Sequence, residues 1–211
     1  MVGIDADRVA GPCIEWGFVL REFSGQEESG DGYLVESHPD GVLVAVVDGL
    51  GHGPKAAEVA KVAIAALEGH ADKSVDFLVK RCHRELAGTR GVVMSLASLD
   101  VRDGTMTWVG VGNVTGLLLR ADSQAERARE TLLPRGGVVG YRLPSLYPVV
   151  ISVAPGDTLI FATDGLRSGF TEGVPLSDAP QQIAEHILEH YGRGTDDALV
   201  LVARYIGRTE S

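Results

Sequence analysis

The chain has 211 residues, of which 45% are hydrophobic and 23% are charged, a balance typical of a globular domain with a sizeable core. Its formal net charge of −10 disfavours nucleic acid and anionic lipid as partners, because both repel an acidic surface. No apolar run is long enough to cross a bilayer, and residues 1–13 lack the apolar segment of a secretory signal. We therefore expect a cytoplasmic protein that binds neither nucleic acid nor membrane.

The two cysteines, Cys13 and Cys82, are too few for a disulfide framework or a four-cysteine zinc site. Cys82 shares helical spacing with Leu78, Val79 and Leu86, which predicts a small core residue. No arginine stands at the spacing of the C-x5-R phosphate-binding loop of cysteine phosphatases. Catalysis by a cysteine nucleophile is therefore not expected.

In the first half of the chain, branched and aromatic residues predict strands over residues 14–23, 33–36 and 42–47. Residues 42–47 are apolar without alternation, as in a strand that is covered on both faces. Pro54 opens a helix at its favoured first position, and alanines recur along one face of that helix as far as Leu67. A second helix is predicted over about 74–86.

In the second half, strands over 92–101 and 105–111 flank Arg102-Asp103-Gly104, which predicts a hairpin, and a short strand follows at 117–119. Residues 121–147 are polar and glycine-rich, so we expect an exposed insert or flap there. Strands over 149–153 and 158–163 flank Pro155-Gly156-Asp157 and predict another hairpin, and a helix over 180–191 and a strand over 198–206 complete the chain. This succession predicts one domain over residues 1–211, in which antiparallel sheets are covered by helices.

Aspartates stand where apolar strands begin or end. Asp48 and Asp164 follow apolar runs directly, while Asp31 and Asp196 precede strands. A carboxylate beside a buried strand is costly unless something pairs with it, and a divalent cation such as Mg²⁺ or Mn²⁺ would satisfy several carboxylates at once. A single Asp-Gly is more often only a turn, as in the polar hairpin at Asp103, so composition leaves both interpretations open.

Two glycine-rich segments invite comparison with nucleotide-binding motifs. Residues 49–55 are too short for a P-loop and carry Ala56 where that motif has Ser or Thr. Pro54 replaces the last glycine of G-x-G-x-x-G, and residues 110–116 miss the same pattern by one position. Nucleotide binding is therefore not expected.

The segment Asp48-Gly49-Leu50-Gly51-His52-Gly53 resembles the D-G-x-G-H-G signature of bacterial type 2C, metal-dependent protein phosphatases of the SpoIIE/RsbU/RsbX group. Further motifs agree in order, and the resemblance spans roughly residues 13–206. They are Ser29-Gly30-Asp31, Pro155-Gly156-Asp157, Ala162-Thr163-Asp164-Gly165 and Thr195-Asp196-Asp197.

The resemblance implies an α+β fold, a four-layer α-β-β-α sandwich with a centre of two Mn²⁺ or Mg²⁺ ions at one edge of the sheets. Asp48 would bridge both ions and Gly49 would bind through its carbonyl. Asp164 and Asp196 would hold one ion, and Asp31 would hold the other, directly or through water. Asp48 and Asp31 would thereby position a metal-activated water that attacks phosphorus in phosphoserine or phosphothreonine, without a phosphoenzyme. His52 would order the loop that enters the helix or orient a metal-bound water, and Asp197 would support the site from behind these ligands.

Within the group the chain resembles the RsbX type most, because no sensor or membrane region precedes the phosphatase motifs and Asn113 stands where many RsbU-like enzymes have His. Leu199 departs from the usual Thr or Ser, which puts a supporting hydrogen bond in doubt. The implied substrates are phosphorylated STAS-domain proteins of a stressosome (RsbS-like and RsbR-like), dephosphorylated by a monomer as negative feedback. The alternative is an RsbU/SpoIIE-like enzyme that acts on a phosphorylated anti-anti-sigma factor.

Two other classes of function compete with this interpretation. His186, Glu189 and His190 match H-x-x-E-H, an inverted zinc-peptidase motif on a predicted helix. Both histidines lie at the border of the apolar face of that helix, which favours partly solvated surface groups. A catalytically inactive module that only docks a STAS protein would have damaged metal positions, whereas Asp31, Asp48, Asp164 and Asp196 are intact.

Overall fold

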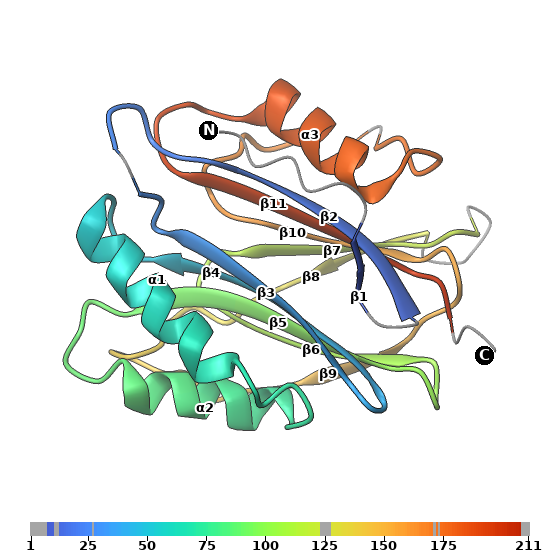
Figure 1. The fold of residues 1–211 in the computed structure, drawn as a ribbon, viewed down its shortest axis with the longest axis horizontal. Coiled ribbons are helices and arrows are strands. Elements are labelled where there is room, and N and C mark those ends of the chain that lie inside the picture. Colours follow the sequence, from blue (N-terminus) through green and yellow to red (C-terminus); the bar gives the residue numbers. More distant parts are fainter. Residues whose placement is uncertain are drawn as a thin grey trace.

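The computed structural model describes residues 8–10, 13–26, 28–122, 128–170, 172 and 174–207. In this part of the chain, antiparallel strands form two stacked sheets (Figure 1). Sheet I has the order β1 (Arg8–Ala10), β2 (Ile14–Arg21), β11 (Ala198–Tyr205), β10 (Thr158–Ala162), β7 (Thr115–Leu119), β8 (Arg129–Leu132). Sheet II has the order β3 (Asp31–His38), β4 (Gly41–Gly49), β5 (Val92–Asp100), β6 (Thr105–Val111), β9 (Val149–Ser152).

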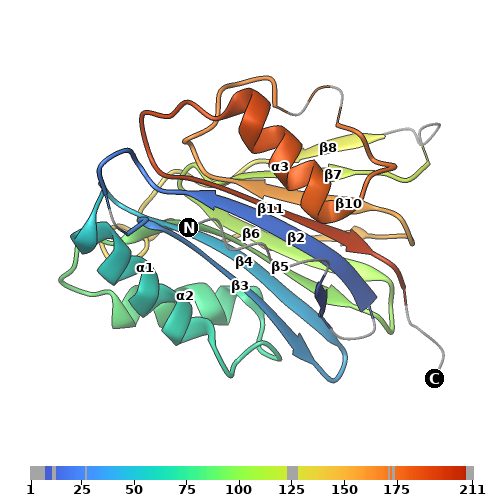
Figure 2. The same cartoon turned by 45° about the horizontal axis from the view of Figure 1, so that its top comes forward.

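Helices cover the outer faces of both sheets. Helices α1 (Pro54–Leu67) and α2 (Val75–Glu85) pack on sheet II, and α3 (Pro180–Tyr191) lies across β2 and β11 of sheet I (Figure 2). The predicted four-layer α-β-β-α sandwich is confirmed. No helix among the described residues is long and apolar enough to span a bilayer.

Strand β4 explains why residues 42–47 carry no hydrophobic alternation. Every side chain from Val42 to Val47 is fully buried. Val42, Val44 and Val46 belong to the core between the sheets, whereas Leu43, Ala45 and Val47 pack under α1 and α2. The strand is apolar on both faces because one face meets a sheet and the other meets helices.

The predicted hairpin between residues 149–153 and 158–163 is wrong. Strand β9 pairs with β6 in sheet II, whereas β10 pairs with β7 and β11 in sheet I. The segment around Pro155-Gly156-Asp157 therefore carries the chain from one sheet to the other. Turn residues between two apolar strands specify a reversal, but they do not specify which strands pair.

The predicted insert over 121–147 is only partly exposed. Residues 129–132 form β8, which pairs with β7, and Val139 is fully buried in the core beneath α2. Leu133 and Tyr141 are 76% and 79% exposed, as expected for an insert. Residues 123–127 lie outside the described part of the chain.

Candidate metal centre

The pairing of β3 with β4 places two of the predicted ligands side by side. Asp31 opens β3 and stands opposite Asp48 in the antiparallel register. The N–H of Gly49 donates to the carbonyl of Gly30 at 2.9 Å, which fixes the approach of the two strand ends. Asp31 is 7% exposed, so its carboxylate lies inside the protein.

Gly49 is required by the packing of α1 against the end of β4. A Cβ atom at this position would lie 2.3 Å from the carbonyl oxygen of Ala56, closer than atoms can approach. The residue after Asp48 must therefore be glycine for the helix to begin where it does. Its predicted role as a carbonyl ligand stays a prediction.

The other two predicted ligands reach the same end of the sandwich from sheet I. Asp164 follows β10 and Asp196 precedes β11, and these strands are antiparallel neighbours. Asp48, Asp164 and Asp196 thereby come together around one cavity of about 180 Å³. The remaining lining residues are Leu50, Gly51, His52, Val93 and Asn113. Asp31 lies beside this cavity as the strand partner of Asp48, and it is not part of the lining.

The electrostatics of this cluster are unfavourable without a cation. Burial, together with the negative charges of Asp31, Asp164, Asp196 and Asp197, raises the pKa of Asp48 to about 8. Burial likewise raises the pKa of Asp31 to about 7, although a hydrogen bond from Thr163 opposes this shift. A divalent cation would stabilise the ionised form of these carboxylates strongly, because their negative charges repel one another without it.

Thr163 is a supporting residue that the sequence did not single out by itself. Its hydroxyl donates to Oδ2 of Asp31 at 2.7 Å and accepts the N–H of Leu199 at 2.9 Å. Asp31 thus receives a supporting hydrogen bond although position 199 is Leu. The hydroxyl orients the Asp31 carboxylate, as outer residues of metal sites do.

Asp197 holds the loop that precedes Asp31. Its carboxylate is buried and accepts the N–H groups of Phe23 and Gly30, each at 2.8 Å. Both carboxylate oxygens are therefore engaged by backbone. The role of Asp197 behind the metal ligands stays a prediction.

Two polar side chains complete the cavity wall. His52 is exposed, lines the cavity, and has its ring centroid 5.8 Å from that of Phe23. Asn113 donates from Nδ2 to Oδ2 of Asp164 at 2.8 Å, which fixes one carboxylate oxygen. In the sequence, Asn113 stands out only as a departure from related enzymes, and its contact with Asp164 spans 51 positions.

The donor set fits a hydrated divalent ion. Among the described side chains, no three acidic, histidine or cysteine residues converge as a ready-made ligand set for one ion. Mg²⁺ usually keeps several waters and takes only one or two carboxylates, so it does not need a closed protein cage. Oxygen donors of high charge at the mouth of an open cavity fit Mg²⁺ or Mn²⁺.

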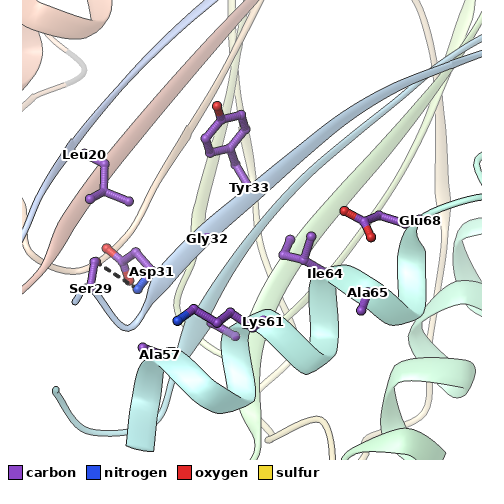
Figure 3. Close-up of a pocket in the computed structure, with 11 residues that line it drawn as sticks. Leu20, Ser29, Asp31, Gly32, Tyr33, Ala57, Lys61, Ile64, Ala65 and Glu68 are labelled. Atoms are coloured by element: carbon purple, nitrogen blue, oxygen red, sulfur yellow. Dashed lines mark hydrogen bonds between the residues drawn. The ribbon is translucent and has the colours of Figure 1, made fainter. Parts of the chain in front are cut away.

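Asp31 also lines a larger groove, which Figure 3 shows. It measures about 430 Å³ and passes between α1 and the strands β2 and β3. Alanines of α1, Ile64 and Tyr33 give it an apolar lining, and Lys61 and Glu68 lie along α1 (Figure 3). The centre is therefore flanked by space into which a polypeptide can extend.

The competing sites lie elsewhere. Cys82 is fully buried in the core, and burial raises the pKa of its thiol to about 12, far from the range of a nucleophile. On α3, the ring centroids of His186 and His190 lie 4.2 Å apart with the rings tilted by 31°, and Nδ1 of His190 forms a hydrogen bond with the carbonyl of His186. These histidines occupy the partly exposed side of the helix that buries Ile183 and Ile187.

Comparison with known proteins agrees with this geometry. A sequence profile described as stage II sporulation protein E (SpoIIE) matches residues 38–206. The chain belongs to the SpoIIE family. The phosphoserine phosphatase RsbX of Bacillus subtilis (strain 168) is 25% identical to this SpoIIE-family chain over 143 residues, which cover 68% of the chain and 70% of RsbX.

Solved structures extend the likeness. A chain from work on the bacterial stressosome, a modular system adapted to control secondary messenger signalling, is 35% identical with a TM-score of 0.81. The match covers 90% of the present chain and 99% of that one. RsbX in complex with magnesium shares the fold with a TM-score of 0.83 at 20% identity, over 97% of this chain and 100% of RsbX. The family match and these relatives together show that the chain is a protein phosphatase.

Proposed function

We propose that this chain is an RsbX-like, metal-dependent phosphatase that hydrolyses phosphoserine or phosphothreonine in STAS-domain proteins of a stressosome, as negative feedback on stress signalling. The observation that carries the proposal is the group of Asp31, Asp48, Asp164 and Asp196 at one end of the sandwich, where burial and mutual repulsion raise the pKa values of Asp31 and Asp48. The 25% identical phosphoserine phosphatase RsbX and the 35% identical stressosome chain support the assignment of substrate class.

In this proposal Asp48, Asp164, Asp196 and Asp31 hold two Mg²⁺ or Mn²⁺ ions. The bound ions would supply a water acidic enough to act as nucleophile and positive charge for the transferring phosphoryl oxygens. Thr163 orients the carboxylate of Asp31, and Asn113 orients that of Asp164. Asp197 fixes the loop that leads into β3 by accepting two backbone N–H groups.

The surroundings of the centre suit a protein substrate. The cavity that Asp48 lines is open, and the groove beside Asp31 gives room for the residues that flank a phosphorylated side chain (Figure 3). A single domain over residues 1–211, action as a monomer and a cytoplasmic location stay predictions of the sequence. The RsbU/SpoIIE-like alternative differs only in the phosphoprotein that the enzyme dephosphorylates.

The test is dephosphorylation of two purified phosphoproteins, a stressosome STAS protein and an anti-anti-sigma factor, followed on phosphate-affinity gels. We expect rapid loss of phosphate from the stressosome protein with Mn²⁺ or Mg²⁺ and none with EDTA. Preference for the anti-anti-sigma factor would move the chain to the RsbU-like role. Tight Mn²⁺ binding with no hydrolysis of either protein would leave a docking module and overturn the proposal.

A further inference from the structure

A further cavity lies at the start of α1. It measures about 260 Å³ and is lined by Lys55, Glu58, Val59, Val62, Thr89 and Arg90. Lys55 and Glu58 come from the start of α1, and Arg90 comes from the segment before β5. The two cationic side chains outnumber the one carboxylate, in a protein whose net charge is −10.

Arg90 connects this cavity to the loop that lines the metal centre. Its Nη1 donates to the carbonyl of Leu50 at 2.8 Å, and the N–H of Leu50 donates to the carbonyl of Gly91 at 3.1 Å. A Cβ atom at Gly51 would lie 2.6 Å from the same Nη1, so the guanidinium lies directly over this glycine. Leu50 and Gly51 line the cavity of Asp48. A side chain that lines this cavity therefore contacts two residues that line the cavity of Asp48.

In the described part of the chain, no carboxylate forms an ion pair with Lys55 or Arg90. Other exposed lysines are neutralised, since Lys61 pairs with Glu28 at 3.0 Å and Lys80 pairs with Asp76 at 2.9 Å. The ion pairs among the described residues include neither Lys55 nor Arg90. Because one guanidinium donor bonds Leu50 and arginine carries five, Arg90 can still bind an anion in a bidentate manner.

We infer that Lys55 and Arg90 form an anion-binding subsite for a second negatively charged side chain of the substrate, close in sequence to the phosphorylated residue at the metal centre. The inference rests on the proposed function and narrows its substrate class. The shared chemistry is an oxyanion, which a phosphate or a carboxylate can supply. On an acidic surface such a local pair of cations selects the orientation in which a charged segment docks.

The test separates binding from turnover. Fluorescein-labelled peptides carry a non-hydrolysable phosphonate analogue of phosphoserine at the target position, with phosphoserine, glutamate or alanine placed at each nearby position in turn. Binding to the Mg²⁺-loaded protein is measured by fluorescence anisotropy. Hydrolysis of the matching phosphoserine peptides is measured by phosphate release.

We expect a second anion at the preferred position to tighten binding about tenfold over alanine. Lys55→Gln and Arg90→Gln should each bring the ratio of the two affinities, anionic peptide over alanine peptide, to within about twofold of unity. Arg84→Gln, which removes an exposed arginine from α2, should keep the ratio of the unchanged protein. The phosphoserine and glutamate peptides show whether phosphate or carboxylate is the natural occupant.

Two results would overturn the inference. One is a protein that shows no preference for a second anion at any position. The other is a preference that survives in both Lys55→Gln and Arg90→Gln, even if Arg90→Gln weakens all peptides equally through its contact with Leu50. If the ratio behaves as expected while no peptide is hydrolysed, the subsite stands and the proposed function fails.

Discussion

The two ends of β10 carry the same residue type in opposite surroundings. Asp157, just before the strand, is 3% exposed, and its carboxylate accepts Arg120 Nη1 at 2.8 Å and the N–H groups of Ala121 and Ala154 at 2.9 and 3.0 Å. Asp164, just after the strand, faces Asp48 and Asp196 around a cavity and receives one hydrogen bond from Asn113. An aspartate that the protein satisfies builds the fold, whereas aspartates left to repel one another prepare a site for a cation.

Substituting Asp48→Asn should have the largest effect. Removal of a shared ligand should lower metal-dependent hydrolysis of a phosphopeptide roughly a thousandfold, which corresponds to about 4 kcal/mol of transition-state stabilisation. In EDTA the same variant should be at least as resistant to urea as the unchanged protein, because a repelling charge has gone. Activity within about tenfold of the unchanged protein would contradict the role of Asp48.

Substituting Asp157→Ala, at the other end of β10, should lower the stability of the protein and leave its activity unchanged. It leaves Arg120 and two N–H groups without their acceptor, although Arg120 still pairs with Glu130. We expect the free energy of unfolding in urea to fall by about 3 kcal/mol. Activity per folded molecule at 20 °C should be retained, and a loss of metal activation would break the contrast.

Substituting Thr163→Val should have a moderate effect on the centre. The hydroxyl that donates to Asp31 and accepts from Leu199 would be lost, so kcat/KM should fall about tenfold and half-activation should need more Mn²⁺. Thr163→Ser should restore both quantities. Thr158→Val, at the opposite end of β10, is the matched control and should leave the Mn²⁺ requirement unchanged.

The pH dependence of stability tests the raised pKa values of Asp31 and Asp48 directly. Asp31 and Asp48 have native pKa values of about 7 and about 8 against an ordinary value of 3.8, so the native state binds more protons than the unfolded state between these values. The free energy of unfolding in EDTA should therefore fall as pH rises from 5 to 8. Saturating Mn²⁺ should oppose this fall, because the metal binds the ionised carboxylates. A stability in EDTA that rises steadily over this range would contradict the raised pKa values.

Much of the fold was predictable because its signals are local. The fully apolar run at Val42–Val47 predicted a strand covered on both faces, and Pro54 marked the start of α1. The sheet to which β9 belongs and the sheet to which β10 belongs were not predictable in the same way. Both strands are apolar and a turn separates them, yet they lie in different sheets because their hydrogen-bond partners are β6 and β7, which are distant in sequence.

The candidate centre was predictable in its carboxylates and not in their support. Asp48 and Asp164 stand out because each follows an apolar strand, and motif order adds Asp31 and Asp196. Thr163 supports Asp31 from 132 positions away, and Arg90 contacts Leu50 from 40 positions away. Such contacts depend on strand register, which a single sequence does not specify.

The most direct test of the central claim is a crystal grown with Mn²⁺ and measured at the manganese absorption edge. We expect anomalous difference peaks for two ions at the end of the sandwich, within reach of Asp48, Asp164, Asp196 and Asp31. Peaks only at His186 and His190 on α3, or none beside Asp48 at saturating Mn²⁺, would contradict the claim that these aspartates form the metal centre.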